Sequence, residues 1–199
     1  MKQLFATVMF ISGLSSAFSQ DSTWTAASKQ MLVDNYLRTQ QAINAETGKL
    51  SLAQWNFKES KDSWNIAMVL EHLNTWQIVT QERVRFMTDN GPQPGYLPSS
   101  QTDSAATKTI QEEQKHTSPP FSVPTGLVPD VANLKLFNVY CDRILDNIRS
   151  SQLNFKLYFR RFNSGYMTNI NQAYMIHYLH VDRHLRQIRR IKSDPKFPK

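Results

Sequence analysis

One short segment near the end of the chain collects three of its five histidines, His177, His180 and His184. On a helix, positions i, i+3 and i+7 form one continuous stripe. Apolar residues extend the same stripe: Ala173, Ile188 and Ile191. The spacing therefore predicts that the three imidazoles face the protein core and not the solvent.

A buried imidazole has two nitrogens that need partners, because an unpaired polar atom in the core is costly. Core histidines satisfied by hydrogen bonds are one interpretation of the stripe. A divalent metal ion satisfies several imidazoles at once, and His180 and His184 have the i, i+4 spacing of helical zinc motifs. His177 and His184 lie two helical turns apart, about 10 Å along the axis, which argues against a metal shared by these two.

The third ligand has to come from another segment, and His72 is the candidate. A lone core histidine is the alternative interpretation. Three histidines leave a position open for water or substrate, which is typical of catalytic zinc sites. We therefore predict a zinc or nickel site whose ligands are His72, His180 and His184. The residues predicted to line the pocket around it are His177, Trp76 and Met68.

The elements that carry these residues are predicted to be helices, because helical spacing is frequent and strand signals are scarce. Four long helices are expected at 23–47, from Asp62 or Ser63 to 89, at 129–150 and at 168–191. A long polar connection, 90–127, contains a predicted short helix at 104–116 and an exposed His116. The pattern predicts an all-α four-helix bundle that forms a single domain over 20–199.

The first 19 residues are expected to be a signal peptide. Lys2 precedes an apolar run, and small residues follow it at Ala17 and Ser19. The alternative, a membrane anchor, needs about 20 apolar residues, and the run is shorter. We expect cleavage after Ser19 and export to the periplasm or beyond the cell. The single Cys141 cannot form an internal disulfide, and we expect it to be a buried apolar residue.

The net charge of +7 comes largely from basic residues late in the chain. A nucleic-acid surface and a solvated helix face are the two interpretations. No nucleic-acid motif accompanies the charge, and an exported protein rarely meets nucleic acid, so the solvated face is favoured. The expected partner is a small-molecule substrate of unknown identity. A homodimer is compatible with a small bundle, but nothing in the sequence requires one.

Two motifs resemble those of the DinB-like superfamily. "DSWNIAMVLEHL" resembles the early motif, in which a tryptophan precedes a helix that ends its motif in His-Leu. "HVDRHLRQIRRI" resembles the late motif, His-x-x-Arg-His-x-x-Gln-Ile. The resemblance implies an up-up-down-down four-helix bundle that holds a divalent metal through His72, His180 and His184. His177 matches no metal position of the family.

The resemblance leaves the reaction open, because fold does not fix function. Similar folds include thiol transferases and uncharacterised metal-dependent hydrolases. Low-molecular-weight thiols are cytosolic, so an exported chain favours a hydrolase. A thiol transferase-like enzyme, a non-catalytic metal- or ligand-binding bundle and a purely structural bundle are the alternatives.

Four other residues near the motifs have expected roles. No general base is evident, because Glu71 and Asp182 lie off the histidine stripe and are expected to be solvated carboxylates. Arg183 and Gln187 are expected to form structural hydrogen bonds between helices.

Overall fold

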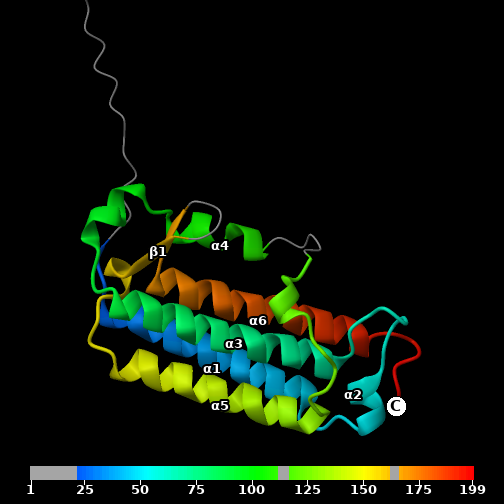
Figure 1. Cartoon of the computed structure of the whole chain (residues 1–199). Helices are drawn as coiled ribbons and strands as arrows, with labels where there is room; N and C mark the ends of the chain where they lie inside the picture. Colours follow the sequence, from blue (N-terminus) through cyan, green and yellow to red (C-terminus); the bar gives the residue numbers. More distant parts are fainter. Residues whose placement is uncertain (1–21, 112–116, 162–165) are drawn as a thin grey trace, which may run out of the picture.

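Four long helices lie side by side in the computed structural model, which describes residues 22–111, 117–161 and 166–199 (Figure 1). They are α1 (Ala26–Thr47), α3 (Ile66–Asp89), α5 (Asp130–Ser150) and α6 (Ile170–Lys192). Helices α3 and α1 each pack against both α5 and α6. The chain is therefore mostly helical, as the sequence predicts.

The directions of these helices differ from the order that the resemblance implied. α1 and α6 run parallel, because Tyr36, midway along α1, contacts Tyr174 near the beginning of α6, whereas Glu46 pairs with Arg189 near the ends of both helices. α3 and α5 also run parallel to each other and opposite to that pair (Figure 1). The order is up-down-down-up, and the up-up-down-down expectation is wrong. An up-up-down-down order would need two connections that run the length of the bundle, and the described residues show one, between α3 and α5.

Asparagine caps fix where the two site-bearing helices begin. The Asn65 side chain accepts a hydrogen bond from the Met68 backbone N–H at 2.8 Å, so α3 begins at Ile66. Asp62 and Ser63 were the predicted caps, and this prediction is wrong: Ser63 closes a turn on Ser60 instead. α6 begins after a capping box in which the Asn169 side chain accepts from the Gln172 backbone.

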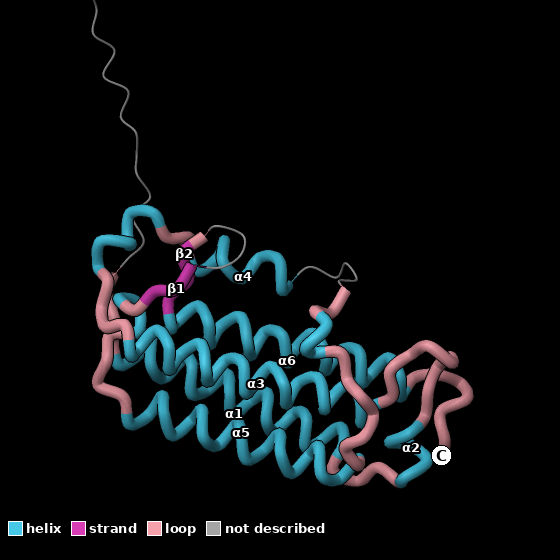
Figure 2. Tube along the Cα trace, viewed as in Figure 1, coloured by secondary structure: helices cyan, strands magenta, loops and turns pink. Residues whose placement is uncertain are grey.

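Short elements at the two ends of the bundle were not expected from the sequence. Helix α2 (Leu52–Asn56) places Trp55 in the core, where it is only 2% exposed. Strands β1 (Phe159–Arg161) and β2 (Met167–Asn169) pair antiparallel, with Phe159 opposite Asn169, just before α6 (Figure 2). A 3-10 turn, η3 (Phe155–Leu157), precedes them. Strands of three residues are too short to show a period-two pattern.

The polar connection between α3 and α5 folds back over the bundle. It contains η1 (Pro94–Ser99), helix α4 (Asp103–Gln111) and η2 (Pro120–Ser122). α4 packs against α6, so the described part of the predicted short helix, up to Gln111, lies along the helix that carries three histidines (Figure 1). His116 lies outside the described residues, and its expected exposure stays a prediction.

The core consists of two apolar clusters along the bundle. Tyr36 and Tyr174 belong to one, and Trp55 and Cys141 belong to the other. Cys141 is 1% exposed and its Sγ accepts a hydrogen bond from Gln77 Nε2 at 2.9 Å. Burial raises the pKa of this thiol to about 12. Cys141 is therefore a buried apolar residue, as predicted, and not a thiolate nucleophile or ligand.

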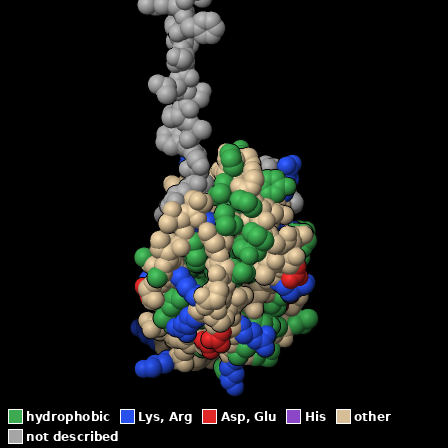
Figure 3. Space-filling view, turned by 90° about the vertical axis from the view of Figure 1, so that its left-hand side faces the viewer, with side chains coloured by type: hydrophobic (Ala, Val, Ile, Leu, Met, Phe, Trp, Pro, Cys, Tyr) green, Lys and Arg blue, Asp and Glu red, His purple; other side chains and the backbone are tan. Residues whose placement is uncertain are grey.

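At the end of the bundle near η1 and β1, hydrophobic side chains gather over the upper part, and Lys and Arg side chains lie mostly over the lower part, among hydrophobic and acidic ones (Figure 3). Its described residues show no histidine on this face, in keeping with the burial of His72 and His184. Within the described residues, no helix combines the length and the apolar character that a membrane crossing requires. The predicted signal peptide, 1–19, lies outside those residues.

Candidate metal centre

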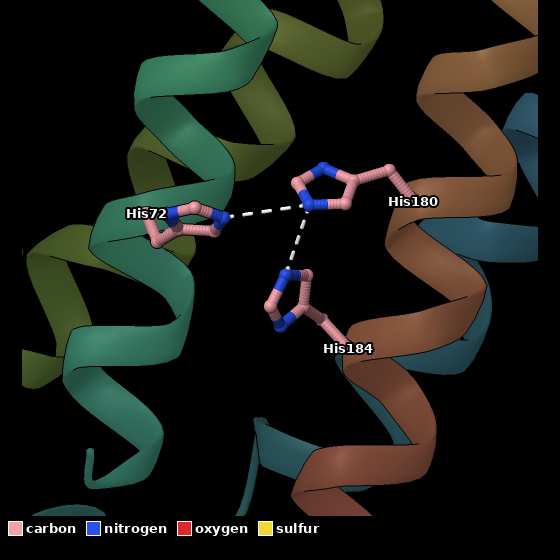
Figure 4. Close-up of side chains that lie close together, drawn as sticks. All are labelled: His72, His180 and His184. Carbon is pink, nitrogen blue, oxygen red and sulfur yellow. Dashed lines mark hydrogen bonds between the residues drawn. The ribbon is translucent and has the colours of Figure 1, made fainter. Parts of the chain in front are cut away.

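Three imidazoles from two helices converge at one point between α3 and α6 (Figure 4). His180 Nε2 lies 3.4 Å from His72 Nε2 and 3.0 Å from His184 Nε2. The three potential ligand atoms all lie within 4.8 Å of one another. The fold therefore brings together the same three histidines that the sequence nominates as metal ligands.

Helix geometry explains the convergence. His180 and His184 lie one turn apart on α6, so their side chains point to the same side. α3 runs antiparallel to α6 and presents His72 across the gap (Figure 4). The His72 side chain is 2% exposed and that of His184 is 8% exposed. The ligand set is thus held by two packed helices, and loops do not determine its spacing.

Two oxygen atoms hold the outer nitrogens of the ligands. His72 Nδ1 lies 2.6 Å from the Ser122 carbonyl oxygen, and His184 Nδ1 lies 2.7 Å from Gln187 Oε1. These oxygens can only accept, so each Nδ1 carries the proton and donates. Both Nε2 atoms then present lone pairs toward the centre. This arrangement is typical of metal-bound histidines, whose outer N–H is oriented by a carbonyl or a carboxylate.

The centre suits a cation better than a hydrogen-bond network. With lone pairs on His72 and His184, a single N–H on His180 cannot satisfy both neighbours. Tetrahedral zinc with Zn–N bonds of 2.0–2.1 Å places its ligand nitrogens about 3.3 Å apart. Two of the three separations, 3.0 and 3.4 Å, lie close to that value, and the third pair of atoms lies within 4.8 Å. The residues present therefore fit a divalent ion bound by three neutral imidazoles.

Burial keeps the ligands unprotonated. It is the main cause that lowers the pKa of His184 to about 3, with His72 adding a smaller effect. Burial also lowers the pKa of His180 well below its usual value, followed by the influence of His184 and His72. For His72, burial lowers the pKa and the hydrogen bond to Ser122 opposes it. Neutral imidazoles are the form that binds metal.

Aromatic rings surround the centre. The Trp64 ring lies 5.0 Å from that of His72, and the Trp76 ring lies 5.5 Å from that of His180. Phe121, in η2, packs against Trp76 with ring centres 5.4 Å apart. These apolar walls restrict water around the imidazoles and strengthen electrostatic interactions there.

A cavity of about 100 Å³ adjoins His180. Two of the predicted pocket residues, Trp76 and His177, line it. The third, Met68, lines a different hollow together with Asn65 and Gly126. The structure thus places His177 beside the centre but not in it: His177 Nδ1 lies 3.0 Å from the Tyr36 hydroxyl.

Both carboxylates expected to be solvated have partners. Glu71 accepts hydrogen bonds from the Thr125 N–H at 2.8 Å, the Thr125 hydroxyl at 2.5 Å and the Gly126 N–H at 2.9 Å. Asp182 forms a two-pronged ion pair with Arg38, each contact being 2.7 Å. Neither carboxylate is buried, which agrees with the expected surface position, but segments distant in sequence supply partners that the sequence did not indicate.

The late motif contains two further residues, Gln187 and Arg183, that lie near the histidine cluster. Gln187 was expected to bridge helices, but its side chain contacts His184 on the same helix, which corrects that expectation. Arg183 lowers the pKa of His184 slightly through its charge. Ser122 was not predicted at all, because a backbone carbonyl that orients His72 leaves no side-chain signal in the sequence.

Comparison with known proteins identifies the class. Residues 35–188 match the model of the DinB superfamily. The match covers more than half of the chain and spans all three converging histidines, so the chain belongs to the DinB superfamily. Searches of curated proteins and of solved structures returned no match.

Proposed function

We propose that this chain is an exported DinB-superfamily metalloprotein that holds zinc or nickel through His72, His180 and His184 and acts as a metal-dependent hydrolase. One observation carries the proposal. The Nε2 atoms of the buried His72 and His184 lie 3.4 and 3.0 Å from that of the half-buried His180, while carbonyl-type oxygens lie against the Nδ1 atoms of His72 and His184.

A three-histidine set leaves a coordination position for water or substrate. When bound there, a divalent ion supplies Lewis acidity toward a substrate oxygen and lowers the pKa of water toward neutrality. The chain contributes the rest: His72 and His184 stay fixed by their Nδ1 hydrogen bonds, and the tryptophans limit access of bulk water. The arrangement supports hydrolysis of a small ester or amide.

The protein's carboxylates do not supply an obvious base. Glu71 is held by Thr125 and Gly126, and Asp182 is held by Arg38. No aspartate or glutamate joins the histidine cluster in the part of the chain that the structure describes. The proposed reaction therefore relies on the acidity that the ion confers and not on a neighbouring carboxylate.

Export distinguishes the hydrolase from a thiol transferase-like enzyme. Water is available outside the cytoplasm, whereas low-molecular-weight thiols are cytosolic cofactors. The buried Cys141, with its raised pKa, does not offer an alternative thiolate. Export itself is tested by mass spectrometry of the secreted or periplasmic protein, whose first residue is expected to be Gln20. An uncleaved chain retained in the cytoplasm would contradict export.

The metal site is tested by elemental analysis of the purified protein. We expect about one zinc or nickel ion per chain in the wild type and less than a tenth of that in His180→Ala. His177→Gln is the matched control, because it changes a buried histidine on the same stripe that is not a ligand, and its metal content should equal that of the wild type. Equal metal content in His180→Ala and wild type would refute the site.

The reaction class is tested with the metal-loaded protein. Esters, amides and thiol acceptors are offered to wild type and to His180→Ala in parallel. We expect hydrolysis of an ester or amide by the wild type alone. Turnover only with thiols would establish the transferase alternative, and metal binding without turnover of any substrate would establish a non-catalytic module. Either result overturns the hydrolase proposal.

A further inference from the structure

The cavity beside His180 has a polar group with no partner. His177 is 3% exposed and lines this cavity with Trp76, Thr80 and Ile176. Its Nδ1 is bonded to Tyr36, but its Nε2 has no hydrogen-bond partner among the described residues. A buried nitrogen left unpaired costs free energy, so a ligand or water that completes it is favoured.

The Tyr36 hydroxyl determines whether His177 carries its ring proton on Nε2. The hydroxyl lies 3.0 Å from His177 Nδ1 and 3.5 Å from the Tyr174 carbonyl oxygen. An O–H···O hydrogen bond is normally 2.5–3.0 Å long, and the contact with the Tyr174 carbonyl exceeds this range. His177 Nδ1 is therefore the better acceptor for the phenol proton. With Tyr36 donating to Nδ1, the neutral ring carries its own proton on Nε2. His177 is therefore an unused hydrogen-bond donor.

Two further donors lie at the same cavity. Trp76 lines it, and the indole Nε1–H has no partner among the described residues. Arg83 also lines it, with its guanidinium carbon 5.2 Å from the centre of the Trp76 ring. Indole and guanidinium groups donate and cannot accept. Of the described residues, no aspartate or glutamate lines this cavity. The lining thus favours a ligand that offers acceptor oxygens.

The size and the remaining walls limit the rest of the ligand. An apolar cavity of about 150 Å³ holds benzene, so this one, at about 100 Å³, takes roughly four non-hydrogen atoms. Ile110, Ala173 and Ile176 supply apolar walls. His180 closes one side, so a group seated in the cavity lies next to the metal centre.

From these observations we infer that the cavity is a substrate subsite for a short acyl group, and that His177, positioned by Tyr36, donates a hydrogen bond to its carbonyl or carboxylate oxygen. This inference rests on the proposed function, because the cavity is a substrate subsite only if the protein is an enzyme. The cavity itself consists of protein atoms alone, so binding there does not require the metal. That difference separates the test of the subsite from the test of the metal site.

The experiment uses metal-free full-length protein with labelled isoleucine and alanine methyl groups, titrated with propionamide, propionate and propylamine. The methyl signals of Ile110, Ala173 and Ile176 report binding by NMR. We expect saturable shifts with propionamide and propionate, and at least tenfold weaker binding of propylamine, which at neutral pH donates but does not accept. Equal binding of propylamine, or propionamide binding only after zinc is added, would overturn the inference.

Variants test the role of His177 directly. His177→Leu is expected to weaken propionamide binding about tenfold, and His177→Gln, which retains an N–H donor, is expected to restore most of it. Tyr36→Phe should weaken binding severalfold, because Nε2 is no longer fixed as the donor, and it keeps the test available if His177→Leu does not fold. Tyr174→Phe is the matched control, because it also removes a buried tyrosine hydroxyl, but one that contacts neither His177 nor this cavity among the described residues. Unchanged binding in both His177→Leu and Tyr36→Phe would refute the assignment.

Discussion

Gln187 holds the outer nitrogen of His184: its Oε1 atom lies 2.7 Å from Nδ1, three residues along the same helix. The contact fixes the proton on Nδ1 and directs the Nε2 lone pair toward His72 and His180. Gln187 is therefore part of the candidate metal centre although it is not expected to touch an ion bound there.

Replacing Gln187 by leucine should weaken metal binding by 10- to 100-fold, which is the usual effect of removing such an outer contact. Competition with a chromophoric chelator measures the affinity. Gln81→Leu is the matched control, because Gln81 lies on α3 and, where the chain is described, its amide bonds to the Gln77 carbonyl and not to a ligand histidine. An affinity that is the same in Gln187→Leu and Gln81→Leu would show that Gln187 does not orient the ligand.

Removing the metal should destabilise the protein. Three imidazole nitrogens, two of which present lone pairs, remain crowded within 4.8 Å when no cation separates them. An ion at 1,000 times its Kd adds about 4 kcal/mol, which for a domain of this size raises Tm by about 10 °C. Thermal unfolding with and without chelator measures the difference. In His72→Ala the chelator should have no effect, and a chelator-insensitive wild type would contradict the prediction.

The Glu71 carboxylate should hold in place the segment that supplies the Ser122 carbonyl. Its carboxylate accepts bonds from Thr125 and Gly126, only a few residues after Ser122. In Glu71→Gln, we expect amide hydrogens of 122–126 to exchange about tenfold faster, equivalent to about 1.4 kcal/mol. Glu82→Gln, which alters an exposed carboxylate paired with Arg85 on the same helix, is the control. Exchange that is unchanged in Glu71→Gln would exclude this anchoring role.

Acid should destabilise the metal-free protein partly through His177. Burial lowers the pKa of this imidazole from 6.5 to about 3 in the folded protein. Below about pH 6.5, the unfolded chain therefore binds a proton that the folded chain does not, and stability falls as the pH falls toward 3. Between pH 6.5 and 5, His177 alone accounts for about 2 kcal/mol.

Urea unfolding at pH 7 and pH 5 tests this prediction. The wild type should lose about 2 kcal/mol more than His177→Gln between these two values, because glutamine does not titrate. The other buried histidines are present in both proteins and cancel in the comparison. Equal losses in the two proteins would mean that His177 is protonated in the folded state.

The local pattern of the sequence determined the helices and half of the centre. The i, i+4 spacing of His180 and His184 and their apolar stripe fix which way both side chains face, since these features depend only on the turn of one helix. The same periodicity located α1, α3, α5 and α6 to within a few residues. The position of His72 in an apolar helix made it a candidate, but no spacing rule joined it to residues more than a hundred positions later.

Only the tertiary structure decided how these parts meet. The path of 90–129 sets α5 parallel to α3, and this gives the up-down-down-up order in place of the expected one. It also brings Ser122 to His72 and binds Glu71, two contacts without a local signature. The pairing of His177 with Tyr36 likewise joins residues on α6 and α1. Such contacts depend on how helices pack across the bundle. The periodicity of one segment predicts its own helix but not which other helix packs against it.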